Sequence, residues 1–411
     1  MSASESLQAE DAYFSSNAPP KQLAAHTALA EAFISQHAAA NRRVVLVTSG
    51  GTTVPLEKNT VRFIDVCQAS LLASPQASSL AVFYVLIDWD GVVKEIVLKV
   101  TSPSTQNFSA GTRGATSAEY FLSAGYAVIF LHRQFSLLPY SRHYSHSTDC
   151  LLDLLEEDSD GRVAVRPSDS DRILDVLRKY QSARRNNMLL LLPFVTIGDY
   201  LHELRAVARL MAPLGSSGLL YLAAAVSDFF VPPERLSEHK IQSTNIVEKL
   251  YPKDAPSPSP QIEDEETFDN FDASPRVPRS KRLIIDLDPV PKFLKSLVEG
   301  WAPLGMIVSF KLETDPRILV HKARYSLERY QHHLVIGNLL STRKWEVVFV
   351  APNRDDQWLR VARHGGWGDA EGRPLRPDEV PEGDPEQEIE ALIIPAVAKL
   401  HDDHIAKSKQ R

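Results

Sequence analysis

The sequence predicts an α/β fold in which a mainly parallel sheet is covered by helices on both faces. Seven short apolar runs have the length and composition of buried strands: residues 43–48, 126–131, 189–194, 219–226, 306–312, 333–338 and 346–351. Stretches with helical spacing separate most of them, at 115–124, 169–185, 198–212, 290–299 and 316–331. Clusters of Gly, Ser, Asp and Asn follow three of the strands, and ligands bind at such strand ends in parallel sheets.

The rest of the chain divides into segments of different composition. Residues 1–20 are polar and end in a Pro pair, which predicts a flexible tail, whereas residues 21–40 are Ala-rich with the spacing of a surface helix. Residues 252–280 are rich in Pro, Ser and acidic residues, which indicates a disordered insertion or, alternatively, a regulatory acidic motif. Residues 352–385 predict a long loop before a C-terminal helix. We therefore expect one domain over 21–411, with insertions at 66–106 and 252–280.

Composition and charge exclude several classes of protein. The 411-residue chain carries a formal net charge of −7, which disfavours nucleic acid or an anionic membrane as its main partner. The N-terminus is acidic without an apolar centre, and no apolar run reaches the ~20 residues that span a bilayer. Cys67 and Cys150 are the only cysteines, so a disulfide scaffold and a cysteine-rich metal site are excluded. We expect a cytoplasmic protein without a metal site of its own.

Two Gly/Ser/Thr-rich turns carry the strongest functional signal. VTSGGTT follows the first predicted strand, and NFSAGTRGATSAE, at 107–119, leads into a helical stretch. Such turns expose backbone N–H groups, and a helix N-terminus adds partial positive charge, so the two turns together can hold a phosphate. One Gly-Gly turn alone is more often a plain tight turn. The pair, flanked by a strand and a helix, favours a nucleotide site.

Neither turn matches the common phosphate-binding motifs. Both lack the Lys of G-x-x-x-x-G-K-[ST], and neither has the G-x-G-x-x-G spacing of dinucleotide-binding folds. A nicotinamide-dependent short-chain dehydrogenase also begins with a strand and a Gly turn, but none of the 12 tyrosines is followed by Lys four positions later. An oxidoreductase is therefore the weaker alternative.

Polar side chains follow further predicted strands. In LAAAVSDFFVP, small residues would let a substrate approach the backbone and Asp228 could accept hydrogen bonds, or the same residues could pack the core and cap a helix. Lys240 suits a phosphate or a developing oxyanion, although a lone Lys is more often a solvated charge. Phe310 and Lys311 offer a ring for a base and a cation for phosphates, and Asn338 can read a base edge. A core ring and a turn cap are the ordinary alternatives.

Residues 66–106 lie between the two Gly-rich turns and resemble neither. One interpretation is a β-hairpin, with AVFYVLI and VVKEIVLKV joined by a D-W-D-G turn. The other is a translated intron, because a Val codon at position 66 begins with GT, Gln106 can be encoded by CAG, and 41 whole codons keep the reading frame. The intron is favoured because removal of the segment gives the continuous stretch VRFIDNFSAGTRGATSAE.

The order of these motifs resembles eukaryotic phosphopantothenoylcysteine synthetase. The similar segments are VVLVTSGGTTVPLE, VRFID joined to NFSAGTRGATSAEYFLSAGY, FVTIGDYLHEL, LYLAAAVSDFFVP, EHKIQS, VPKFL, WAP, SFKLETD and RYQHHLVIGN. The resemblance implies a Rossmann-like three-layer fold and a homodimer. It also implies a ligase of coenzyme A biosynthesis that joins 4′-phosphopantothenate to L-cysteine, using ATP with Mg²⁺ and an acyl-adenylate, and releasing AMP and pyrophosphate.

The resemblance also implies roles for individual residues. Asn107 would hydrogen-bond the substrate carboxylate and the acyl-adenylate, and Lys240 would lie on a flap over that intermediate. Arg62 would reach the substrate phosphate of the other subunit. The pantothenate arm would contact Ala224, Ala225 and Asp228, and the nucleotide site would comprise Gly50, Gly51, Ser109, Gly111, Gly114, Phe310, Asn338 and, for its charge, Lys311. Because residues 66–106 separate Arg62 from Asn107, a catalytically impaired nucleotide-binding scaffold is the other alternative.

Overall fold

The centre of the molecule is an eight-stranded sheet with the order β14-β13-β12-β11-β8-β1-β4-β7. The computed structural model describes residues 3–58, 63–65, 110–144, 151–238, 287–363 and 372–410. The strands from β7 to β12 run parallel, and β13 and β14 are antiparallel additions at one edge. Their bounds are β1 Val44–Ser49, β4 Ala127–Arg133, β7 Leu189–Phe194, β8 Gly218–Leu222, β11 Met306–Glu313, β12 Leu334–Leu339, β13 Glu346–Val350 and β14 Gln357–Arg360.

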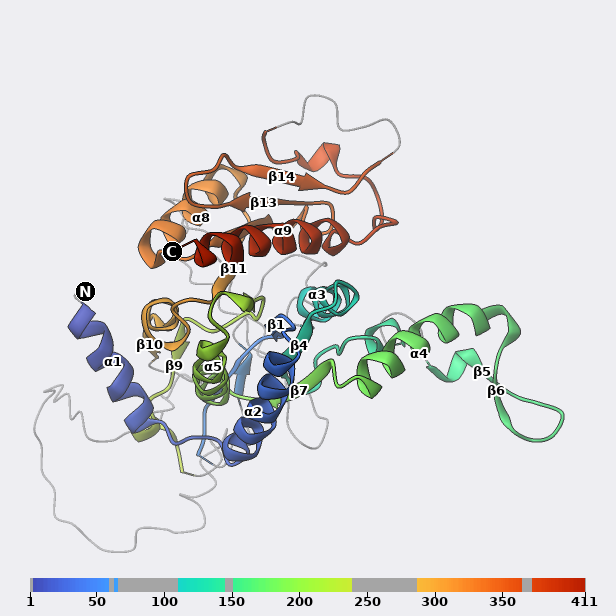
Figure 1. Cartoon of the computed structure of the whole chain (residues 1–411), viewed down its shortest axis with the longest axis horizontal. Coiled ribbons are helices and arrows are strands. Elements are labelled where there is room, and N and C mark those ends of the chain that lie inside the picture. The colour runs from blue at the N-terminus through green and yellow to red at the C-terminus, as the bar shows by residue number, and fades with distance from the viewer. Residues whose placement is uncertain are drawn as a thin grey trace, which may run out of the picture.

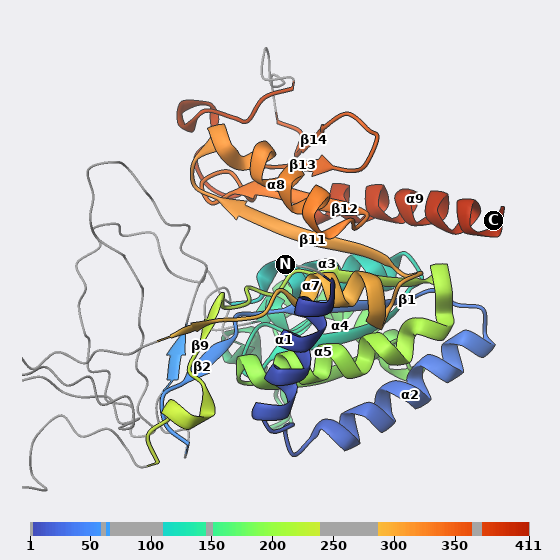
Figure 2. The same ribbon diagram turned by 90° about the vertical axis from the view of Figure 1, so that its left-hand side faces the viewer.

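Helices cover both faces of this sheet (Figures 1 and 2). Successive side chains of a strand point to opposite faces, so Val44 and Leu46 of β1 pack on one side and Val45 and Val47 on the other. The first face is covered by α2 Leu23–Ala39, α5 Ile197–Met211, α7 Phe293–Ser296 with the π-turn Leu297–Trp301, and α8 Pro316–Tyr330. The second face is covered by α3 Thr112–Ser123, α9 Glu390–Lys409 and the end of α4 Ser170–Arg185. The predicted α/β fold is confirmed.

The N-terminal segment differs from its prediction. Residues Ala3–Ser16 form helix α1, and both Glu10 and Tyr13 are buried. The ring of Tyr13 lies 5.2 Å from that of Phe293, edge to face, and Trp301 Nε1 donates a 3.0 Å hydrogen bond to Glu10 Oε1. The prediction of a flexible tail is wrong for this helix, because its few apolar side chains are covered by residues almost 300 positions away.

Among the described residues, three small antiparallel pairs accompany the main sheet. β2 Thr53–Pro55 pairs with β3 Phe63–Asp65, and β9 Phe229–Phe230 pairs with β10 Asp288–Pro289. In Figure 2, β2 and β9 extend beyond one end of the sheet. The third pair, β5 Leu155–Glu157 with β6 Val163–Val165, projects with α4 from the body of the molecule (Figure 1). Short 3₁₀ turns occupy Ser141–Tyr144, Leu151–Leu154, Pro167–Asp169, Ala212–Ser217, Pro233–Arg235 and Pro377–Glu379.

Several sequence expectations concern residues outside the described ranges. Both segments proposed as insertions, 66–106 and 252–280, lie there, so the two interpretations of 66–106 stay predictions. The loop predicted over 352–385 contains β14, a four-residue strand too short to stand out from its polar surroundings. In the described part of the chain, every helix is too short or too polar to cross a membrane.

Candidate active site at the reversal of strand order

The strand order reverses between β1 and β8. From β1 the chain proceeds to β4 and β7 on one side, and it then returns to β8, β11 and β12 on the other. In open α/β sheets, the crevice at the carboxyl ends of two such strands is where ligands bind. Here three segments meet at that crevice: the turn after β1, the segment after β8, and the N-terminus of α3.

The two Gly-rich turns predicted to act together are in contact. Gly50 has a left-handed φ of +84°, and a Cβ on Gly111 would lie 3.3 Å from Gly50 N. A Cβ on Gly114 would lie 2.4 Å from Ser49 Oγ, closer than real Cβ atoms come. Ser49 Oγ donates a 3.0 Å hydrogen bond to the carbonyl oxygen of Gly111. Only glycines therefore let the start of α3 lie directly against the end of β1.

The first turn of α3 has the properties of an anion site. The helix begins after Gly111, no side chain of the described residues caps this end, and its first turn contains no acidic residue. The first N–H groups of a helix have no partner within the helix, and they carry the positive end of its dipole. The guanidinium of Arg113, in the same turn, is engaged elsewhere, because it donates to Glu390 Oε1 and to the carbonyl oxygen of Arg343, both at 2.7 Å. Backbone N–H groups thus dominate the site.

The segment after β8 is tied to the first Gly-rich turn. Ala225 N donates to Gly50 O at 2.8 Å, and Thr52 N donates to Ala225 O at 3.1 Å. Ala224 N donates to Thr48 Oγ1 at 3.1 Å. Ala224 and Ala225 therefore lie beside the Gly turn, and Gly51 forms a β-bridge with Ala225. Thr48 and Thr52 were not selected from the sequence, although hydroxyl residues on both sides of the Gly pair were a visible signal.

Asp228 lies further along the same segment. Its half-exposed carboxylate accepts a 3.2 Å hydrogen bond from Lys292 Nζ, and its backbone oxygen accepts one from Val290 N at 2.9 Å. Asp228 is followed by strand β9, so it does not cap a helix. Lys292 belongs to the segment VPKFL, for which no chemical role was predicted. The structure thus adds a cation beside the predicted carboxylate.

Phe310 and Asn338 share the face of the sheet that α3 and α9 cover. The ring of Phe310 packs edge to face against Tyr221 at 5.2 Å, within the cluster on that face. Asn338 is paired with Leu312, two positions beyond the pair of Ile336 with Phe310, so its side chain alternates onto the same face. The side chains of β1 and β12 are separated by three strand spacings, roughly 14 Å. A nucleotide can bridge that span with its base at one end and its phosphates at the other.

The amide of Asn338 carries a second signal. The residue is 7% exposed, and its Oδ1 is buried without a hydrogen-bond partner in the described part of the chain. A buried oxygen of this kind costs about 1–3 kcal/mol when it is unpaired, so native structures rarely keep one without a reason. A donor on a bound ligand, such as an exocyclic amine of a base, would satisfy it.

The structure does not bring Lys311 to this group. Lys311 follows Phe310 on β11 and therefore points to the opposite face, where its Nζ lies 3.5 Å from Glu313 Oε1. Four other predicted site residues, Arg62, Asn107, Ser109 and Lys240, lie outside the described ranges. Among the described residues, no three His, Cys, Asp or Glu side chains are arranged to hold a metal ion.

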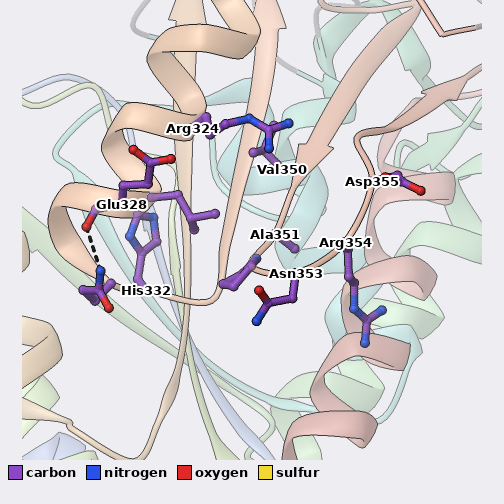
Figure 3. A pocket seen from close by; sticks show the side chains of 11 residues that line it. Arg324, Glu328, His332, Val350, Ala351, Asn353, Arg354 and Asp355 are labelled. Atoms are coloured by element: carbon purple, nitrogen blue, oxygen red, sulfur yellow. Dashed lines mark hydrogen bonds between the residues drawn. The ribbon is translucent and has the colours of Figure 1, made fainter.

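A cavity of about 630 Å³ lies elsewhere in the molecule (Figure 3). It is bordered by the end of α8 and by the turn after β13. It thus lies where the parallel strand β12 begins, whereas the Gly turns lie where the parallel strands end. Its two arginines are already paired, Arg324 with Asp356 and Arg354 with Asp403, each at 2.9 Å. This cavity is not part of the candidate site.

The similarity of the chain to known proteins extends over most of its length. No family model matches it. It is 40% identical over 407 residues to phosphopantothenate–cysteine ligase CAB2 of Saccharomyces cerevisiae, covering 98% of this chain and 88% of the yeast protein. It is 36% identical over 332 residues to the human phosphopantothenate–cysteine ligase, covering 80% and 82%. A solved structure of a Cab2 mutant in complex with phosphopantothenate-cysteine superposes with a TM-score of 0.69 at 39% identity, covering 97% of this chain and 99% of that chain.

Proposed function

This chain belongs to the phosphopantothenate–cysteine ligase family, and on that premise we propose that it joins 4′-phosphopantothenate to L-cysteine through an acyl-adenylate made from ATP. The observation that carries the nucleotide part of this proposal is the contact between Gly50 and the N-terminus of α3, beside Ala224 and Ala225. This contact supports a backbone-lined anion site at the reversal of strand order.

The proposed chemistry needs no nucleophile from the protein. A carboxylate oxygen of the substrate attacks the α-phosphorus of ATP, an O–P bond forms, and the P–O bond to pyrophosphate breaks. The amine of cysteine then attacks the acyl carbon, a C–N bond forms, AMP leaves with the electrons of the C–O bond, and the amine proton goes to solvent. The protein positions the reactants and stabilises the charge that develops on oxygen.

The described residues suit a site that binds the phosphates of the nucleotide at one end and its base at the other. Gly50, Gly51, Gly111 and Gly114 would hold the phosphates, and Mg²⁺ would enter with the nucleotide. Phe310 and Asn338 would hold the adenine, with the unpaired Oδ1 of Asn338 accepting from an amine of the base. We leave Lys311 out of this set, because it faces the other side of the sheet and pairs with Glu313.

Contacts with the other substrate are proposed from the family resemblance together with the geometry. Asp228 would accept hydrogen bonds from the pantothenate arm, and Lys292 beside it would balance negative charge of the substrate. Asn107 would hold the carboxylate and the acyl-adenylate, Lys240 would close over the intermediate, Ser109 would contact the phosphates, and Arg62 would act across a homodimer. A cytoplasmic location belongs to the same proposal.

Oxygen labelling tests both the reaction and its intermediate. The purified chain is incubated with ATP, Mg²⁺, L-cysteine and 4′-phosphopantothenate carrying ¹⁸O in its carboxylate. The masses of the products are then measured by mass spectrometry. The proposal requires phosphopantothenoylcysteine and AMP containing one ¹⁸O atom, because the adenylate oxygen comes from the carboxylate. Product formed with ADP, or with unlabelled AMP, would reject the acyl-adenylate while leaving the ligase. A folded chain that forms no product would reject the ligase and favour the impaired scaffold.

A further inference from the structure

We infer that Ser136 is a further ATP-contacting residue, whose hydroxyl donates a hydrogen bond to a phosphate oxygen of the nucleotide. This inference rests on the proposed function and adds a third wall to its phosphate site. Ser136 lies in the loop after β4, the strand next to β1, and neither the motifs nor the strand pattern pointed to it.

Ser136 touches both Gly-rich turns. Its Cβ lies 3.3 Å from the position that a Cβ would take on Gly50, and also 3.3 Å from that position on Gly111. Arg133 Cβ lies 2.8 Å from that position on Gly50, and Ser49 Oγ lies 2.8 Å from that position on Gly111, so both side chains pack beside Ser136. The two glycines and Ser136 therefore border the same small space, and a phosphate held by the turns would lie within reach of the hydroxyl.

The hydroxyl of Ser136 has a free hydrogen-bonding capacity. Its Oγ is buried and has no partner in the described part of the chain. Neighbouring hydroxyls differ, because Ser49 Oγ donates to Gly111 O, Thr48 Oγ1 accepts from Ala224 N, and Thr52 Oγ1 accepts from Ser227 N. A buried hydroxyl without a partner is unfavourable, and an anionic oxygen is the strongest acceptor that a phosphate site can offer it.

The loop that carries Ser136 is fixed to α3, the helix whose N-terminus would face the phosphates. Leu137 N donates to Ala110 O at 2.9 Å, immediately before the helix. Tyr140 N and Arg142 Nε both donate to Glu119 Oε1 of α3 at 2.7 Å. The hydroxyl and the helix N–H groups thus form one rigid arrangement. Such preorganisation is what a binding site for a charged group needs.

The residue before Ser136 adopts a costly backbone conformation. Phe135 has a φ of +66° although its ring is 95% exposed and gains little from packing. Bulky residues rarely occupy this left-handed region, and strained residues persist mainly where a loop must hold a functional geometry. The strain supports the inference that the position of Ser136 is required.

Two substitutions test the inference. Ser136→Ala removes the donor, and Ser136→Cys keeps nearly the same volume with a much weaker donor. Ser141→Ala is the matched control, because its hydroxyl lies in the same loop but is exposed and bonds Leu138 O. Dissociation constants for ATP with Mg²⁺ and for adenosine are measured by calorimetry, with the melting temperature of each unliganded variant. We expect both Ser136 variants to bind ATP about tenfold more weakly, with unchanged adenosine binding and melting temperature.

Three outcomes separate the possibilities. ATP affinity equal to that of the unmodified chain in both Ser136 variants would overturn the inference while leaving the proposed function intact. Equal weakening of ATP and adenosine, together with a lower melting temperature in Ser136→Cys, would show a structural role and also overturn it. Failure of the unmodified chain to bind ATP would instead overturn the proposed function itself.

Discussion

At the scale of single residues, Asn338 and Ser136 each have a buried side-chain oxygen without a hydrogen-bond partner in the described part of the chain. Each such atom lowers the stability of the unliganded protein, since water solvates it in the unfolded chain. Each is explained if a ligand supplies the missing partner. Substitution at these positions should therefore separate ligand binding from stability.

Asn338→Leu is expected to weaken ATP use without destabilising the protein. The substitution removes the unpaired amide, so the free energy of unfolding should stay unchanged or rise by up to about 1 kcal/mol. The KM for ATP should rise about tenfold, because the exocyclic amine of the base would lose a fixed acceptor. Urea unfolding and steady-state kinetics measure both effects, with the exposed Asn186→Ala as control. A destabilised variant with an unchanged KM for ATP would make Asn338 a structural residue.

Lys292 shows how far residue chemistry could be predicted from sequence. The contact between the two Gly-rich turns could be predicted, because Gly-rich turns after strands carry a local signature. Lys292 and Ser136 carry none, since each acquires its position only when β10 and the loop after β4 fold against segments far away in sequence. Lys311 was assigned to the site for its charge, but strand alternation turns it away from Phe310.

At the scale of elements, the site depends on the contact of α3 with β1. Gly114 lies in the first turn of α3, and a Cβ there would approach Ser49 Cβ to 2.5 Å and the backbone Cα of Ser49 to 3.1 Å. Neither strand nor helix can absorb this overlap by rotating a side chain. The helix would have to move away from the end of β1.

Gly114→Ala is therefore expected to destabilise the protein by about 1–3 kcal/mol and to raise the KM for ATP. The matched control is Gly300→Ala, where the described residues outside its own helical turn place no atom within 4 Å of the added Cβ, and the stability should change by less than about 1 kcal/mol. Urea unfolding and ATP kinetics on both variants measure these effects. A Gly114→Ala variant as stable and as active as the control would contradict the close packing of α3 on β1.

Helix α1 is expected to contribute to stability through the buried ring of Tyr13. Tyr13 is 3% exposed, so Tyr13→Ala should lower the free energy of unfolding by about 3 kcal/mol. Tyr13→Phe should be close to neutral, because the Tyr13 hydroxyl has no partner among the described residues and burial raises its pKa. Tyr325→Ala, at a site that is 56% exposed, serves as the control. If Tyr13→Ala unfolds like the control, the N-terminal segment is a tail after all.

At the scale of the whole molecule, His332 and His401 are buried, and His333 packs against His404 of α9 with ring centroids 4.6 Å apart. His332 and His333 precede β12, and His401 on α9 bonds both Tyr126 OH and Ser216 O. Burial lowers the pKa of all three to about 4, and for His333 the neighbouring His404 and His401 lower it further. Arg43 also opposes protonation of His401, whereas Asp402 favours it.

The protein is expected to lose stability as the pH falls from 6.5 to 5. The unfolded chain binds protons on these histidines in that range while the folded chain does not, so the free energy of unfolding decreases. His401→Gln should reduce the slope of stability against pH by up to ~1.4 kcal/mol per pH unit, the contribution of one proton. The exposed His321→Gln should leave the slope unchanged. Urea unfolding at several pH values measures it, and a flat profile between pH 6.5 and 5 would contradict neutral buried histidines.

The α/β fold class of the whole molecule could be predicted from the sequence, but the order and direction of its strands could not. Alternating apolar runs and helical stretches indicated a parallel sheet covered on both faces. The order of the strands was not available, because the pairing of β8 with β1 joins residues more than 170 positions apart. The antiparallel direction of β13 and the burial of α1 depend on contacts of the same long range.

We propose that this fold uses the Gly-lined crevice to activate 4′-phosphopantothenate with ATP. Pyrophosphate release tests it most directly, measured on the complete chain and on a variant lacking residues 66–106, with each substrate added or withheld. We expect release only when ATP and 4′-phosphopantothenate are both present, sustained turnover only when L-cysteine is added, and a marked reduction in Gly114→Ala. Pyrophosphate release that does not depend on 4′-phosphopantothenate, or the absence of release from both folded chains, would contradict this activation step.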